Sequence, residues 1–106
     1  MNDVFIGVPF DGVENEVPRI DLIATREDEA LAIAAGMKLA GGEPCVFMQD
    51  SGLGNSLDVI TSLLIPYKIN VDLLICHRDK PEHHRAMGDS SLSILNLVGY
   101  DAFRYC

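Results

Sequence analysis

Basic residues are scarce in this chain of 106 residues. Lys and Arg number 8 against 16 Asp and Glu, which gives a formal net charge of -8. Nucleic acid and anionic membranes would have to approach against that field, so we expect neither as a partner. Long apolar runs are also lacking, and the run Val71–Cys76 is far too short to span a bilayer. The amino-terminal stretch has no basic region and only a short apolar run, so we expect no secretory signal and a cytoplasmic location.

Metal-binding and disulfide patterns are absent as well. The cysteines number 3, an odd count, and no CxxC pair occurs. We therefore expect reduced thiols that serve as small core residues. The histidines show no HxxxH spacing, and the adjacent His83 and His84 would point apart in a helix or a strand, so we expect no metal site.

The remaining composition is that of one folded domain covering residues 1–106. Apolar residues make up 48% of the chain and charged residues 23%. The mean hydropathy of +0.17 is high for a small free-standing monomer. Some of the apolar surface is therefore expected to meet a partner.

Short apolar runs alternate with helical stretches. The runs that predict strands are 4–8, 20–24, 45–48, 71–76 and 102–105. The helices are expected at 26–40, at about 55–65, and from 89–91 to 98, each followed by Gly or Pro. Because the strands lack polar alternation, they fit a parallel sheet that is covered on both faces. The predicted fold is a three-layer α/β/α domain with a mainly parallel sheet.

The first expected helix is apolar almost all round, since only Lys38 is charged between Ala30 and Ala40. The sheet of a small domain covers one side of such a helix, so the other side is expected to meet a second subunit. The alternative is a helix that packs only on its own sheet and keeps Lys38 at the surface.

Two segments could carry chemistry or could be purely structural. Glu27, Asp28 and Glu29 begin the first helix, where carboxylates are favoured by the helix dipole in any case. The segment 49–56 (QDSGLGNS) joins a strand to a helix, and its glycines could expose backbone N–H groups to a phosphate or a cofactor. It matches neither the P-loop nor the GxGxxG pattern, so a simple connecting turn remains the alternative.

Taken together, these segments resemble a known family. The quoted parts are 26–30 (REDEA), 32–36 (AIAAG), 48–56 (MQDSGLGNS), Ile65-Pro66 and the 81–84 segment (PEHH) leading to Met87-Gly88. Together they are similar to the pyrimidine-binding domain of thiamine diphosphate-dependent decarboxylases. Within that superfamily they look most like the alpha subunit of sulfopyruvate decarboxylase and the matching domain of phosphonopyruvate decarboxylase.

The resemblance implies specific roles. The family's glutamate, which hydrogen-bonds the aminopyrimidine of thiamine diphosphate and activates that cofactor, falls on Glu27. The cofactor-binding turn falls on the segment Ser51, Gly52, Leu53, Gly54 and Asn55. Substrate contacts fall on Gln49 and Arg78, and the alternative for Arg78 is a solvated arginine in a loop. The implied reaction is decarboxylation of a 2-oxoacid, with sulfopyruvate favoured.

The resemblance also implies partners. The family holds Mg²⁺ and the diphosphate through a GDG motif, and no GDG occurs in this chain. A separate pyrophosphate-binding subunit of beta type is therefore expected to hold Mg²⁺ and to share the cofactor. Self-association through the pyrimidine-binding domain is expected too.

The chain departs from the family pattern in three places. It begins almost at the first strand, whereas relatives usually carry a helix before it. Asp50 stands where members of the family it resembles have Asn, and a carboxylate there would repel an anionic substrate. The residues Cys76-His77-Arg78-Asp79 replace a segment that usually contains Trp-Arg-Gly. Two alternatives therefore stay open: a non-catalytic assembly or regulatory subunit, and a stand-alone binder of a phosphate ligand.

Overall fold

The computed structural model describes residues 1–77 and 85–106 and contains a five-stranded sheet in the order β2-β1-β3-β4-β5. Its strands are β1 Val4–Gly7, β2 Leu22–Ile23, β3 Pro44–Gln49, β4 Asp72–Cys76 and β5 Phe103–Tyr105. Every neighbouring pair is parallel. The predicted α/β fold with a parallel sheet is confirmed, and the strands fall within or beside the apolar runs that predicted them.

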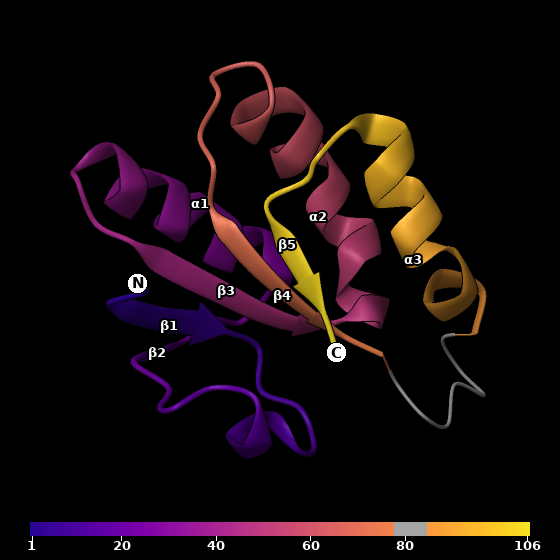
Figure 1. Ribbon diagram of the computed structural model, residues 1–106, viewed down its shortest axis with the longest axis horizontal. Helices are drawn as coiled ribbons and strands as arrows, with labels where there is room; N and C mark the ends of the chain where they lie inside the picture. Colours follow the sequence, from indigo (N-terminus) through magenta and orange to yellow (C-terminus); the bar gives the residue numbers. More distant parts are fainter. Residues whose placement is uncertain (78–84) are drawn as a thin grey trace.

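The helices lie together on one face of the sheet (Figure 1). They are α1 Glu27–Leu39, α2 Leu53–Val59 and α3 Arg85–Val98. The chain moves in one direction across the sheet from β2 to β3, β4 and β5, so right-handed crossovers place all of these helices on the same side. The step from β1 to β2 runs the other way, and its connection covers part of the opposite face. That layer contains only a short 3-10 turn, η1 Val13–Asn15.

Two apolar cores follow from this layering. The larger core lies between the helices and the sheet, and its fully buried side chains include Ile6, Val46, Met48, Leu73 and Ile75. A smaller core on the other face consists of Phe5, Val13, Val17, Cys45, Phe47, Leu74 and Cys76. Alternate residues of β3 therefore pack into the two different cores, which explains the continuous apolar sequence of this strand.

Helix α1 buries one side and leaves the other open. Ala30, Leu31, Ala34 and Ala35 are buried, whereas Ala32, Gly36 and Leu39 are exposed. Lys38 is half-buried and pairs with Glu43 at 2.8 Å. A second subunit on the open side stays a prediction.

The other helices differ slightly from expectation at their ends. The helix expected at about 55–65 begins at Leu53 and continues after α2 as a π-helical turn, η3 Ile60–Leu64. Helix α3 begins at Arg85, before the predicted start at 89–91. Arg85 lies 3.5 Å from Asp89, an i,i+4 pair within the turn that the sequence pattern left out. No helix among the described residues is long and apolar enough to cross a membrane.

The expectation of reduced thiols is wrong for two of the cysteines. Cys76 and Cys106 form a disulfide across a sequence separation of 30 residues. The parallel pairing of β4 with β5 brings the ends of the two strands together, and Cys106 N donates to Ile75 O at 2.8 Å. Cys45 is free and buried, and burial raises the pKa of its thiol, so it serves as the small core residue that was expected.

Candidate functional site

The candidate site lies at the carboxyl edge of the parallel sheet. Glu27 begins α1 just beyond the end of β2, and the segment 50–55 follows β3 directly. His77 follows β4, and Tyr105 belongs to the end of β5. Ligands of open parallel sheets bind at this edge, because the loops and helix starts that follow the strands converge there.

Glu27 and the glycine-rich turn are in contact, although the turn lies about 25 residues further along the chain. The amide Nδ2 of Asn55 donates to Oε1 of Glu27 at 3.0 Å. Gly52 is buried, and a Cβ added to it would lie 2.5 Å from Cγ and 2.8 Å from Oε2 of Glu27. Only a residue without a side chain allows the carboxylate to lie this close to the turn. The structure thus brings together Glu27, Gly52 and Asn55, three of the residues that the sequence predicted for one site.

The remaining predicted residues of the turn take different positions. Leu53 is fully buried in the larger core, so its side chain supports the turn from beneath. Ser51 is half-buried, and Gly54 is exposed, with its position for a Cβ 3.1 Å from Met87 of α3. Gln49 is half-buried at the last position of β3. Arg78, like the 81–84 segment, lies outside the described residues.

The other two carboxylates of the first turn have different surroundings from Glu27. Asp28 pairs with Arg26 at 3.1 Å, and this hydrogen bond holds the pKa of Asp28 below its usual range. Glu29 accepts a hydrogen bond from Thr25 N at 2.8 Å. Both therefore serve the helix start, and contact with the glycine-rich turn distinguishes Glu27 among the three.

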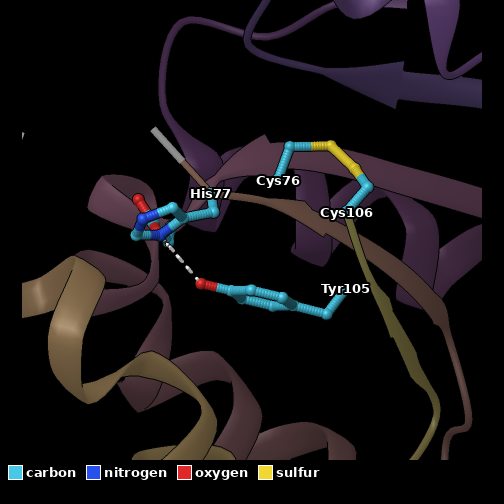
Figure 2. The surroundings of a disulfide bond; sticks show 5 residues. Cys76, His77, Tyr105 and Cys106 are labelled. Carbon is cyan, nitrogen blue, oxygen red and sulfur yellow. Dashed lines mark hydrogen bonds and ion pairs between the residues drawn. A yellow bond between two sulfur atoms is a disulfide. The ribbon is translucent and has the colours of Figure 1, made fainter. Parts of the chain in front are cut away.

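A second polar cluster surrounds Asp50, and sequence reasoning did not find it. Asp50 is fully buried, and its Oδ2 lies 2.7 Å from Nδ1 of His77. The hydroxyl of Tyr105 donates to the same Oδ2 at 3.3 Å and lies 3.1 Å from Nδ1 of His77. Figure 2 shows the His77 and Tyr105 rings side by side, next to the Cys76–Cys106 disulfide.

The cluster keeps the Tyr105 phenol protonated. Burial raises the pKa of Tyr105 above its ordinary value, and the neighbouring carboxylate of Asp50 adds to the rise. Ser91 of α3 donates to the same hydroxyl at 3.4 Å. The sequence signals for this cluster were two separate departures from the family pattern, Asp50 and the segment that contains His77, and nothing in the sequence joined them. The contact of Asp50 with His77 depends on β3 and β4 being neighbours, which the sequence does not state directly.

The position of Asp50 alters one inference drawn from the sequence. A carboxylate at this position was expected to repel an anionic substrate. Instead the side chain is fully buried and hydrogen-bonded to His77, so it does not face the solvent-accessible surface where a substrate would bind.

No described cluster offers a convincing metal site. Glu16, Cys76 and Cys106 place their ligand atoms within 4.8 Å of one another among residues 1–77 and 85–106. The two sulfurs are bonded to each other, however, and a disulfide lacks the thiolates that bind metals. A surface hollow of about 260 Å³, lined by Cys45, Asp72 and Arg104 among others, lies at the opposite, amino-terminal edge of the sheet. It is therefore separate from the site at the carboxyl edge.

Comparison with characterised proteins supports the family resemblance. Over 66 residues, 62% of this chain, it is 44% identical to sulfopyruvate decarboxylase subunit alpha of Methanocaldococcus jannaschii. Over 70% of this chain it is 44% identical to the same subunit of Methanothermobacter thermautotrophicus. Over 72% of this chain it is 42% identical to phosphonopyruvate decarboxylase of Streptomyces viridochromogenes.

These matches cover only part of each relative. The chain spans 39% and 47% of the two alpha subunits and 20% of the Streptomyces enzyme. No protein-family model matches the chain.

Proposed function

From its homology, over about 70% of its length, to sulfopyruvate decarboxylase alpha subunits and phosphonopyruvate decarboxylases, we propose that this chain is the pyrimidine-binding part of a thiamine diphosphate-dependent 2-oxoacid decarboxylase. Sulfopyruvate is the proposed substrate, and sulfoacetaldehyde and CO2 are the products. The observation that carries the proposal is the contact of Glu27 with Gly52 and Asn55. It joins the two segments on which the family resemblance most depends.

The described residues fit the aminopyrimidine end of the cofactor. A carboxylate at the start of α1, fixed through Oε1 by Asn55, is a suitable acceptor for a ring N–H or a shared proton. Thiamine diphosphate, when bound, supplies the electron-accepting centre that lets a 2-oxoacid lose CO2. The chain itself contributes Glu27 to hold a proton at the aminopyrimidine. The turn Ser51–Asn55 forms the wall against which that carboxylate is held.

The diphosphate end requires a partner. The sequence has no GDG motif, so a separate beta-type subunit is proposed to hold Mg²⁺ and the diphosphate. Two of the relatives are named as alpha subunits, which supports a divided enzyme. Glu27 is only half-buried in the single chain. A subunit seated on the open side of α1, where Ala32 and Gly36 are exposed, would exclude water from its carboxylate and strengthen its hydrogen bonds.

Substrate contacts are proposed for two residues. Gln49 ends β3 at the carboxyl edge, half-buried, with an amide that can donate to a carboxylate or sulfonate oxygen. Arg78, directly after His77, is proposed to bind an acid group of the substrate with its fork of donors.

The test is a decarboxylation assay with matched variants. The chain is mixed with a candidate GDG-bearing subunit, thiamine diphosphate, Mg²⁺ and sulfopyruvate, and CO2 release is followed. We expect turnover only in the mixture, a loss of at least ~100-fold for Glu27→Gln, and near-normal turnover for Asp28→Asn. Asp28 is the control because it begins the same helix but pairs with Arg26.

Two results would contradict the proposal. A stable complex that turns over neither sulfopyruvate nor phosphonopyruvate would leave an assembly or regulatory subunit with the same fold. Equal losses for Glu27→Gln and Asp28→Asn would show that the helix start tolerates no change, and that Glu27 has no special role.

A further inference from the structure

The cluster around Asp50 has a feature that packing alone does not explain. Asp50 is completely buried, and a buried carboxylate is costly unless a positive charge and hydrogen bonds compensate it. Its Oδ2 has two partners, His77 and Tyr105. Its Oδ1 has no hydrogen-bond partner among the residues that the structure describes. Of the described groups bonded to Asp50, His77 alone can carry a positive charge.

Asp50 also determines which nitrogen of the His77 ring carries the proton. An ionised carboxylate only accepts hydrogen bonds, so the 2.7 Å contact requires a proton on Nδ1. The opposite nitrogen, Nε2, is then the basic atom when the ring is neutral and an acid when the ring is charged. No hydrogen bond to Nε2 occurs within the described part of the chain, and 39% of the His77 side chain is accessible.

The ring is held on a further side by α3. A Cβ on Gly88 would lie 3.4 Å from both Cε1 of His77 and Oδ2 of Asp50, so the helix backbone packs against the pair. Tyr105 lies beside the ring, with centroids 6.2 Å apart. The imidazole is thus fixed by Asp50 of the 3-10 turn after β3, by Tyr105 of β5 and by α3, while one nitrogen stays accessible. That combination is typical of a proton-transfer group rather than of a core histidine.

The pair lies next to the proposed cofactor wall. Asp50 and Gly52 belong to one 3-10 turn, η2 Asp50–Gly52. Gly52 contacts Glu27, and Asp50 contacts His77. The same short turn therefore positions a carboxylate on one side and an imidazole on the other.

Resting on the function proposed above, we propose that His77 is a catalytic acid of the decarboxylation and that Asp50 is its positioning residue. When the 2-oxoacid loses CO2, the bond between its carboxylate carbon and its carbonyl carbon breaks, and the electron pair stays on the carbonyl carbon. That carbon takes one proton to give the aldehyde. Nε2–H of protonated His77 supplies this proton, and the neutral ring that results keeps its Nδ1 proton on Asp50. Water then restores the proton to Nε2, so each cycle consumes one proton and releases one aldehyde and one CO2.

The first test needs no activity. In the chain labelled with ¹⁵N-histidine, two-bond ¹⁵N–¹H spectra at a pH where the ring is neutral report which nitrogen carries the proton. We expect His77 in the Nδ1–H form in the natural chain. In Asp50→Asn, an almost isosteric change, the amide can donate to Nδ1, and we expect the majority form to become Nε2–H. An Nε2–H majority in the natural chain, or no change in the variant, would overturn the positioning role.

The second test uses the active mixture of subunits. We expect His77→Gln to lower kcat by at least ~100-fold with KM little changed, because the acid acts after substrate binding. Asp50→Asn should lower kcat by at least ~10-fold, in step with the tautomer change. Tyr105→Phe, which removes only the outer hydroxyl, should stay within ~10-fold of the natural chain.

The outcomes separate the two proposals. An active natural mixture in which His77→Gln retains full kcat would overturn this inference and leave the decarboxylase proposal intact. A natural mixture with no turnover would overturn the proposed function, and the catalytic role of His77 would fall with it. Loss of activity in Glu27→Gln together with full activity in His77→Gln would assign the protonation of the carbonyl carbon to a group other than His77.

Discussion

Gly52 offers the sharpest test of the geometry around Glu27. Its backbone has φ -83° and ψ -8°, which any residue adopts, so Gly52→Ala introduces no backbone strain. The change instead places a methyl group 2.5 Å from Cγ and 2.6 Å from Cδ of Glu27. Ordinary carbon contacts are about 3.5–4.0 Å, so the Glu27 side chain must retreat by about 1 Å or turn away from Asn55.

The expected effects on stability and on catalysis differ in size. Replacing glycine by alanine at a compatible backbone position stabilises the fold by about 0.4–1 kcal/mol, because it reduces the conformational entropy of the unfolded chain. Overpacking costs about 1–3 kcal/mol. Because Glu27 is half-buried and able to move, the net loss in the free energy of unfolding should lie at the lower end, about 1 kcal/mol. A displacement of 1 Å in a reacting geometry costs ~100-fold in rate, so decarboxylation should fall by about that factor.

The assay compares urea unfolding and decarboxylation for the natural chain, Gly52→Ala and Gly54→Ala. Gly54 is the matched control, since a Cβ there would lie 3.1 Å from the flexible end of Met87 and does not meet Glu27. We expect Gly54→Ala to leave the contact between Asn55 and Glu27 in place, so its loss of activity should be smaller than that of Gly52→Ala. Full activity in Gly52→Ala would refute the reasoning, because it would show that Glu27 does not work in the position that the structure gives it. A large loss of stability in Gly52→Ala would show that Glu27 cannot move as argued.

Three further predictions concern the stability of the fold, each measured by urea unfolding. The Cys76–Cys106 disulfide joins residues 30 positions apart, so its reduction should lower the free energy of unfolding by up to about 3–4 kcal/mol. An unchanged free energy of unfolding in the presence of a thiol reductant would contradict the pairing. Tyr100→Phe should cost about 1–3 kcal/mol at neutral pH, because the buried Tyr100 hydroxyl donates to Val71 O. Burial raises the pKa of Tyr100 in the fold, so the natural chain should be stable below pH ~10 and lose about 1.4 kcal/mol per pH unit above it, a slope that Tyr100→Phe should reduce. Gly7→Ala should cost about 3 kcal/mol or more, because its Cβ would lie 2.1 Å from a backbone oxygen of β3 that cannot retreat, and a stable variant would contradict that packing.

The sequence predicted the elements well where apolar patterns are continuous. The strand at 45–48 lies within β3, and the helix at 26–40 contains α1, because the Gly41-Gly42 pair separates the two segments. The start of α3 was placed too late because Ala86 and Met87 are the only apolar side chains in its first seven residues and give no apolar period. The second face of the sheet has a thin layer, since the crossover that reaches it contains no helix longer than η1.

The candidate site was predictable only through local motifs. Glu27 and the turn at 51–55 were identified from their segments, but their contact required the β2-β1-β3 order. The Asp50–His77 pair and the Cys76–Cys106 disulfide each join residues from two different elements, 27 and 30 positions apart. A single sequence does not show such long-range pairs, because they depend on the register between neighbouring strands.

The central place of β3 has a consequence for which parts of the molecule stay ordered together. Backbone amides of β3 are hydrogen-bonded between two neighbours, and its side chains are buried on both faces, so they should exchange with deuterium only when the whole fold opens. The two-residue edge strand β2 should exchange through local opening. The turn that begins at Asp50 continues directly from β3, so it is attached to the last part of the molecule to open. Transient opening of the β2 edge would therefore leave this turn unchanged. The distance between Asp50, which contacts His77, and Gly52, which contacts Glu27, would be kept as well.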